Sequence, residues 1–256
     1  MRGRNAVVTG GGRGVGAAVA AKLAAAGVTV MVAARTAEQV ESVAEALRIK
    51  GFAAHAETCD VADPRSIERL AARAEKRLGS IDILVNNAGT ALASALHKTT
   101  LDDWNRLIAI NATSAFLCLK AILPGMIAQR WGRVVNVASI AGLRGDRYIA
   151  AYAASKHALV GLTTSAAAEA APHGVTVNAV CPGYLRTDMT RESVERIMRT
   201  TGRTEEQALD AILQTTPQRR LIEPTEVADA IAYLCSDSAA GVNGSALIID
   251  GGELRR

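Results

Sequence analysis

Short runs of β-branched and other apolar residues alternate along the chain with longer, alanine-rich stretches of helical character. Most of the short runs are apolar at nearly every position, as in the strands of a parallel sheet that helices cover on both faces. The alternation is typical of parallel βαβ units. Seven strands are expected, at Asn5–Thr9, Thr29–Ala33, Ala53–Glu57, Ile81–Asn86, Arg133–Ala138, Thr176–Cys181 and Ala246–Asp250.

The stretches between these runs predict helices, and four of them are followed by a glycine that suits a helix C-cap, at Gly27, Gly51, Gly79 and Gly174. The helices are expected near Val15–Ala26, Ala37–Lys50, Pro64–Leu78, Leu101–Arg130, Tyr152–Ala171 and Thr225–Cys235. No internal repeat or low-complexity linker divides the 256 residues. We therefore expect a single α/β domain, residues 1–256, with a doubly wound, Rossmann-type parallel sheet.

Residues 187–217 interrupt the alternation of strands and helices, because they are polar, charged and helical in pattern. An insertion at this point follows the sixth strand and lies at the C-terminal edge of the sheet, where open α/β sheets bind ligands. The segment is predicted to be a helical lid. The alternative is a helical decoration with no gating role.

Composition narrows the class of protein. The chain is 49% hydrophobic and 21% charged, which is ordinary for a soluble domain. Its four cysteines stand alone, without the spacing of a zinc site, so no metal is expected. A net charge of +4 without basic, aromatic-containing clusters argues against nucleic-acid binding. No signal peptide and no long apolar run is evident, so we expect a cytoplasmic protein that does not enter the membrane.

The first strand runs directly into a glycine-rich turn, Thr9-Gly10-Gly11-Gly12-Arg13-Gly14-Val15-Gly16, which opens a helix. Glycines at such a place permit a tight turn and let a pyrophosphate approach the N–H groups of the helix N-terminus. Close packing of a helix on a strand would also explain glycines, but their position on the first strand favours a dinucleotide site.

The end of the second strand indicates which dinucleotide binds. A site for NAD places an acid there to hold the ribose 2′-hydroxyl, whereas this chain has Ala34, Arg35 and Thr36. A guanidinium can bind a 2′-phosphate through paired, charged hydrogen bonds, and Arg13 in the glycine turn could reach the same group. NADPH is therefore the predicted cofactor, with NAD as the alternative.

Ser139 and the segment Tyr152-Ala-Ala-Ser-Lys156 carry the predicted chemistry. Tyr152 and Lys156 are four residues apart, so they share one face of a helix. An ordinary phenol has a pKa of about 10, and a neighbouring Lys⁺ together with an oxidised nicotinamide would favour its ionised form. These residues predict a tyrosine that exchanges a proton with a carbonyl or alcohol.

Taken in order, these motifs, with Asn86-Asn87-Ala88-Gly89 and Cys181-Pro182-Gly183, resemble the short-chain dehydrogenase/reductase family over essentially the whole chain. The resemblance implies a seven-stranded sheet and a catalytic tetrad of Asn111, Ser139, Tyr152 and Lys156. It also implies that Asn111 anchors a water that links Lys156 to solvent. The expected cofactor contacts are Gly10, Gly12, Arg13, Gly14, Val15, Gly16, Arg35, Thr36, Asp60, Val61, Asn87, Ala88, Gly89, Tyr152, Lys156, Pro182, Gly183, Leu185 and Thr187.

Within that family the chain is most similar to bacterial ketoreductases of 3-oxoacyl thioesters and polyketide intermediates, which implies a ketone substrate linked to a carrier protein or coenzyme A. Arg144 and Arg147, just ahead of Tyr152, could recognise a phosphate or carboxylate of such a substrate, or form a solvated rim. A dehydrogenase of a free alcohol and a non-catalytic NADPH-binding sensor remain as alternatives. The family resemblance further implies a homotetramer, with a dimer as the alternative.

Overall fold

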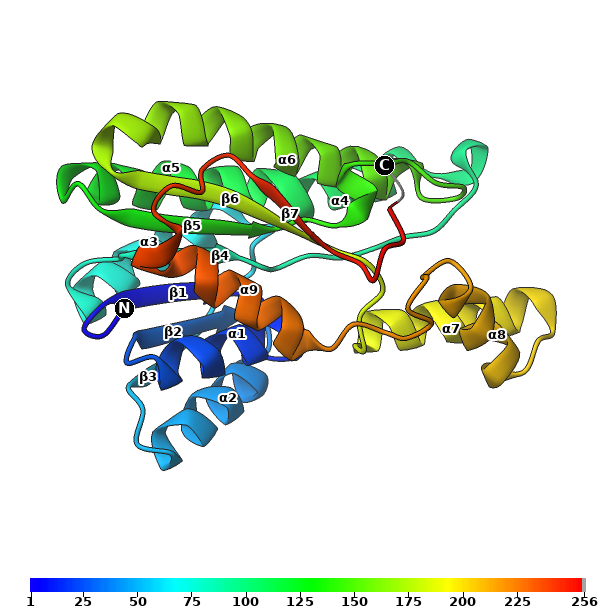
Figure 1. Ribbon diagram of the computed structural model, residues 1–256, viewed down its shortest axis with the longest axis horizontal. Helices are drawn as coiled ribbons and strands as arrows, with labels where there is room; N and C mark the ends of the chain where they lie inside the picture. The colour runs from blue at the N-terminus through cyan, green and yellow to red at the C-terminus, as the bar shows by residue number, and fades with distance from the viewer. Residues whose placement is uncertain (255–256) are drawn as a thin grey trace.

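The computed structural model describes residues 1–254 and shows one sheet of seven parallel strands in the order β3-β2-β1-β4-β5-β6-β7 (Figure 1). The strands are β1 (Asn5–Thr9), β2 (Thr29–Ala34), β3 (Ala54–Thr58), β4 (Ile83–Asn86), β5 (Gly132–Val137), β6 (Val175–Pro182) and β7 (Ala246–Ile249). The predicted fold class is confirmed.

Helices cover both faces of the sheet (Figure 1). They are α1 (Gly14–Ala25), α2 (Ala37–Ile49), α3 (Pro64–Leu78), α4 (Leu101–Ile108), α5 (Ser114–Ala128), α6 (Ala150–Ala170), α7 (Asp188–Thr201), α8 (Glu205–Leu213) and α9 (Pro224–Cys235). The strand β1 shows why both faces need a cover. Ala6 and Val8 belong to one apolar cluster and Val7 to another, since successive side chains of a strand point to opposite faces.

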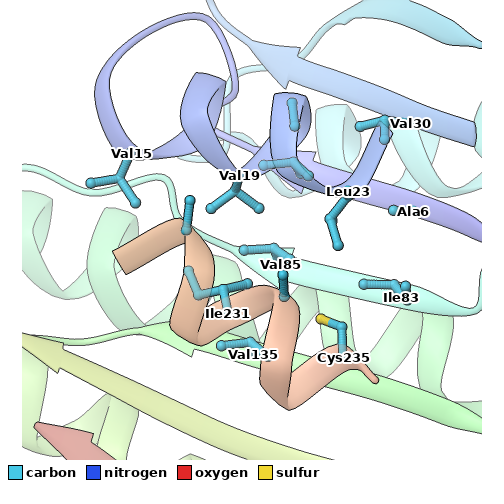
Figure 2. Packing of buried hydrophobic residues seen from close by; sticks show 14 of the residues in the cluster. Ala6, Val15, Val19, Leu23, Val30, Ile83, Val85, Val135, Ile231 and Cys235 are labelled. Carbon is cyan, nitrogen blue, oxygen red and sulfur yellow. The ribbon is translucent and has the colours of Figure 1, made fainter. Parts of the chain in front are cut away.

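The first apolar cluster joins α1, α2 and α9 to the sheet, with α1 and α9 packed side by side (Figure 2). Leu23 of α1 and Ile231 of α9 are completely buried in it. The second cluster joins α3, α5 and part of α6 to the opposite face. With the sheet buried on both sides, the carboxyl ends of the strands are the accessible edge at which a ligand can bind.

The long helix predicted over Leu101–Arg130 is not continuous. A five-residue π-helical segment, Ala109–Thr113, separates α4 from α5 and contains Asn111. Apolar periodicity does not reveal such an insertion, because the flanking α-helical turns continue on either side of it. Single π turns often occur at functional sites, where they redirect one side chain.

The whole element Leu101–Ala128 is long and apolar enough to cross a membrane by length and composition. Core helices of globular proteins meet the same criterion, and Leu119 and Ile122 of this helix are buried in the second apolar cluster. The helix therefore has a place in the fold as a cover of the sheet.

The predicted insertion after β6 folds as α7 and α8, which extend beyond the carboxyl ends of the strands (Figure 1). The two helices share a small apolar cluster of their own, which includes Val194 and Ile212. A bridge between Leu185 and Ile222 closes the base of the insertion. The segment is thus attached to the sheet at a narrow base and packs mainly against itself.

Candidate active site

A cavity of about 580 Å³ opens at the carboxyl edge of the sheet. Nearly all of the predicted site residues line it, from the glycine turn to the start of α7. They are Gly10, Gly12, Arg13, Gly14, Val15, Arg35, Thr36, Asp60, Val61, Asn87, Ala88, Gly89, Ser139, Tyr152, Lys156, Pro182, Gly183, Leu185 and Thr187. Two predicted residues, Gly16 and Asn111, are not part of the lining and lie behind it.

The glycine turn is held from below by the loop that follows β4. Asn87 Nδ2 donates to the carbonyl oxygens of Thr9 and Gly10, at 3.0 and 3.1 Å. Gly10 has a φ of +64°, and a Cβ there would lie 2.8 Å from Asn87 Nδ2, so this position requires glycine. Gly16 contributes in the same way, because a Cβ would collide with the Gly10 carbonyl.

The turn leads directly into α1, whose N-terminus has no side-chain cap. The first N–H groups of a helix lack partners within the helix, and they lie beside the positive end of its dipole. A diphosphate suits such a place. The cradle therefore fits the pyrophosphate of a dinucleotide.

Two arginines lie where the adenosine ribose of a dinucleotide would carry its phosphate. Arg35 directly follows β2 and Arg13 belongs to the turn, and both line the cavity together with Gln39, which the sequence analysis did not identify. Arg13 also donates to Asp188 at the start of α7 over 3.0 Å. Since no carboxylate takes the place of Arg35 after β2, the charges fit NADPH better than NADH.

Ser139, Tyr152 and Lys156 converge on the opposite wall of the cavity. Ser139 follows β5 and accepts a hydrogen bond from the Ala141 amide at 3.1 Å. Tyr152 and Lys156 lie one turn apart on α6, with the Lys156 ammonium 5.9 Å from the centre of the Tyr152 ring. The ammonium donates to the Val137 carbonyl at 2.9 Å, which anchors it at the end of β5.

Burial dominates the electrostatics of this wall. It raises the pKa of Tyr152, while a hydrogen bond with Ser139 opposes the rise. Burial also lowers the pKa of Lys156 from 10.5 to about 8. The protein alone therefore keeps Tyr152 protonated at neutral pH, which suits a proton donor. The lowering of the Tyr152 pKa by Lys156 and an oxidised nicotinamide stays a prediction for the enzyme with its cofactor.

Asn111 acts as a buried clamp behind this wall. Its Oδ1 accepts from the Thr90 amide at 2.8 Å, and its Nδ2 donates to the Thr90 carbonyl and to Ser155 Oγ, both at 2.9 Å. Ser155 in turn donates to the Tyr152 carbonyl at 2.7 Å. Both polar atoms of the Asn111 side chain thus bind protein groups, and its predicted role as an anchor for water stays a prediction.

Several residues in the cavity or just behind it carry no recognisable signal in the sequence. Ser155 lies within the Tyr–Lys motif but was not identified as functional. Arg106, Tyr184, Arg196 and Glu253 reach the cavity from distant elements. His157, in contrast, is exposed, and its Nδ1 lies 2.8 Å from the Ala153 carbonyl, as expected for a side chain that points away from the site.

Side chains that could bind a metal do not gather near the cavity. Within residues 1–254, no group of three or more His, Cys, Asp or Glu side chains is arranged to hold a metal ion. The four cysteines are buried, and burial raises the pKa of the Cys181 thiol, which lies near Ser139 and Lys156, to about 11.

Comparison with known proteins agrees with this geometry. The family described as short chain dehydrogenase matches residues 4–197. Ketoacyl reductase 1 of the granaticin polyketide synthase of Streptomyces violaceoruber is 41% identical, over 96% of this chain and 92% of its own. The D-beta-hydroxybutyrate dehydrogenase of Rhizobium meliloti is 35% identical, over 97% of this chain and 98% of its own.

The crystal structure of a single-substitution variant of the actinorhodin polyketide ketoreductase, determined with NADPH, superimposes with a TM-score of 0.95. It is 37% identical in sequence, covering 99% of this chain and 98% of that one. The family match over residues 4–197 and the structural match over 99% of the chain confirm the family resemblance predicted from the sequence. The protein belongs to the short-chain dehydrogenase family and is an oxidoreductase that acts on CH–OH groups.

Proposed function

We propose that the protein reduces a ketone to a secondary alcohol with NADPH, and that Tyr152 is the proton donor. One observation carries this proposal: Ser139, Tyr152 and Lys156 line the same cavity as the glycine turn and the two arginines. A hydride donor and a proton donor can therefore reach one carbonyl group within the same cavity.

The side chains of this wall provide the steps of the reaction. When bound, NADPH supplies a hydride to the carbonyl carbon. Ser139 donates a hydrogen bond to the carbonyl oxygen and orients it, and Tyr152 transfers its phenolic proton to that oxygen as negative charge develops. Lys156 holds the nicotinamide ribose, and its positive charge stabilises the phenolate that remains on Tyr152.

Asn111 and Ser155 hold Tyr152 in place from behind the cavity. The clamp on Thr90 fixes the π-helical segment, and Ser155 connects it to the turn of α6 that carries Tyr152. Proton transfer needs the donor and acceptor within about 3 Å of each other. We therefore assign Asn111 and Ser155 to positioning.

The substrate class is inferred from the relatives. Ketoacyl reductases of polyketide synthases stand among them, which favours a 3-oxoacyl thioester attached to a carrier protein or coenzyme A. The hydroxybutyrate dehydrogenase supports a second candidate, a free keto acid or other unattached ketone. We further propose a cytoplasmic homotetramer, as the family resemblance implies.

The insertion at residues 187–217 is proposed to act as the lid over the nicotinamide. Thr187, Met189 and Ser193 of the insertion line the cavity, so the position of α7 determines how enclosed the site is. Exclusion of water would strengthen the hydrogen bonds to the reacting oxygen.

The test is an assay of cofactor oxidation with purified protein, NADPH or NADH, and a panel of ketones. The panel contains acetoacetyl-CoA, acetoacetate, a bicyclic ketone, a steroid ketone and a keto-sugar. Turnover of the thioester with NADPH supports the proposal. Turnover of free ketones alone would indicate the second candidate, an unattached ketone, as the substrate. Tight binding of NADPH without turnover of any ketone would contradict the proposed reaction and favour a non-catalytic NADPH-binding sensor.

A further inference from the structure

The carboxyl-terminal turn after β7 places an acid in the wall of the catalytic cavity. Asp250 ends this strand region, and its two carboxylate oxygens accept from the amides of Gly252 and Leu254, at 2.8 and 2.6 Å. Gly251 and Gly252 have φ values of +63° and +87°, which only glycine adopts readily. The chain therefore turns back sharply, and Glu253 is directed toward the cavity instead of into solvent.

Glu253 is buried at this position. Its side chain is only 6% exposed, although it lines the cavity. Thr216 Oγ1 donates to its Oε2 at 3.4 Å, and the nearest guanidinium nitrogen of Arg144 lies 4.0 Å from Oε1. A carboxylate offers about four acceptor positions. The neighbouring Thr215 hydroxyl also acts on this carboxylate as a hydrogen-bond donor. Two hydroxyl donors and an ion pair beyond hydrogen-bond distance still leave acceptor capacity, as far as residues 1–254 show.

The acid shares its cavity with the reacting groups and lies beside a predicted cofactor contact. A Cβ added to Gly183, one of the predicted cofactor contacts, would be 3.4 Å from Glu253 Oε2. Tyr152, Tyr184 and Glu253 all line this one cavity. A substrate whose ketone contacts Tyr152 can therefore reach Glu253 without leaving the cavity.

We propose that Glu253 is a substrate-recognition residue, which accepts a hydrogen bond from a hydroxyl group of the ketone and makes the enzyme prefer hydroxylated ketones over their alkyl counterparts. The inference rests on the proposed ketone reduction and refines its substrate class. An alkyl chain against Glu253 would leave the acceptor positions on the cavity side of a buried carboxylate without water or a donor, which is costly. A hydroxyl restores that hydrogen bond.

The charges around Glu253 favour a neutral hydrogen-bond donor on the substrate over an ammonium group. Arg144 already lies beside the carboxylate, and a second cation would have to share it. Arg196 adds a further positive charge to the same cavity. A hydroxyl group accepts a hydrogen bond as well as donating one, so it can lie between Glu253 and Arg144 and use both.

The experiment compares matched substrates that differ by one hydroxyl group. The parent is the N-acetylcysteamine thioester of 3-oxohexanoate, and its partners carry a hydroxyl at the fourth, fifth or sixth carbon. The same alkyl and hydroxyalkyl groups are also offered as free methyl ketones. The proteins are the full-length wild type, Glu253→Leu, Glu253→Gln and the control Glu206→Leu, which alters an exposed acid of α8 outside the cavity.

In the wild type, kcat/KM for at least one hydroxylated isomer is expected to exceed that of its parent by about tenfold or more. Glu253→Leu should remove this preference, through a loss of about 10- to 100-fold in the ratio of kcat/KM for the hydroxylated ketone to kcat/KM for its parent. Glu253→Gln retains a neutral acceptor, so it should lose part of the preference. Glu206→Leu should keep all of it.

The inference is overturned if no isomer is preferred by the wild type, or if folded Glu253→Leu keeps the preference. Thermal denaturation establishes whether Glu253→Leu is folded. If it is not folded, the inference is overturned by an undiminished preference for the hydroxylated ketone in Glu253→Gln. Failure of the proposed function is different, because neither parent nor hydroxylated ketones would then be reduced.

Discussion

Ser155 offers a direct test of the hydrogen-bonded support behind the active site. It is completely buried, accepts from Asn111 Nδ2 at 2.9 Å and donates to the Tyr152 carbonyl at 2.7 Å. In Ser155→Ala the Asn111 amide loses one acceptor inside the protein, where water does not replace it. An unsatisfied buried polar group costs about 1–3 kcal/mol.

For a chain of this size, that loss corresponds to a fall in Tm of roughly 2–12 °C. The Ser155 hydroxyl also connects Asn111 to the turn of α6 that carries Tyr152. We therefore expect kcat to fall by roughly 10- to 100-fold, since misplacement of a catalytic group by about 1 Å has an effect of that order. NADPH affinity should change little. Thermal denaturation, steady-state kinetics and a fluorescence titration with NADPH measure the three quantities.

The matched control is Ser165→Ala, on an exposed position of the same helix, where the change in stability should stay within about 0.5 kcal/mol. The reasoning is refuted if Ser155→Ala has the Tm and kcat of the wild type. It is also refuted if Ser165→Ala loses as much as Ser155→Ala, because the loss would then come from the helix and not from the clamp.

Three further predictions concern the cofactor, the buried lysine and the core. Arg35→Asp should lower kcat/KM for NADPH by about 10- to 100-fold relative to NADH, because a carboxylate repels the 2′-phosphate; an unchanged ratio in the kinetic assay would exclude this role. Burial lowers the pKa of Lys156 to about 8. Between about pH 8 and 10.5 this lysine is therefore protonated in the unfolded chain but mostly neutral in the folded protein. The stability of the cofactor-free wild type should therefore rise with pH over this window relative to Lys156→Met, by up to about 3 kcal/mol in urea denaturation, and a flat difference would contradict the shift. Leu23→Ala should cost about 2–5 kcal/mol in the same measurement, as Leu23 is fully buried between α1 and the sheet; a cost below about 1 kcal/mol would show that the core there is loosely packed.

The sequence predicts the sheet well, because most strands are nearly continuous apolar runs whose side chains fill both faces. Strand ends are less certain. The strand expected from Ile81 begins at Ile83. Asp82 lies just ahead of it, and its carboxylate accepts from the Asn5 amide at 2.8 Å and from Arg4 at 3.0 Å. That interaction depends on two segments far apart in the chain, which no local pattern records.

In the active site, too, residues within one element are predictable from the sequence and those that depend on distant segments are not. Tyr152 and Lys156 are predictable because they share one helix and their spacing defines a common face. The π-helical turn around Asn111 is not, because it depends on the partners that Thr90 and Ser155 provide from other elements. Glu253 has no sequence signal at all, since its place in the cavity depends on a turn at the end of the last strand.

The central claim is that Tyr152 donates the proton when NADPH reduces a ketone in this cavity. The most direct measurement compares the wild type with Tyr152→Phe in one experiment, following NADPH binding by fluorescence and NADPH oxidation by absorbance with the best ketone of the panel. The account predicts that the variant binds NADPH as the wild type does and loses at least about 100-fold in kcat, the lower end of what general acid catalysis contributes. A variant that still reduces the ketone at the wild-type rate would contradict it.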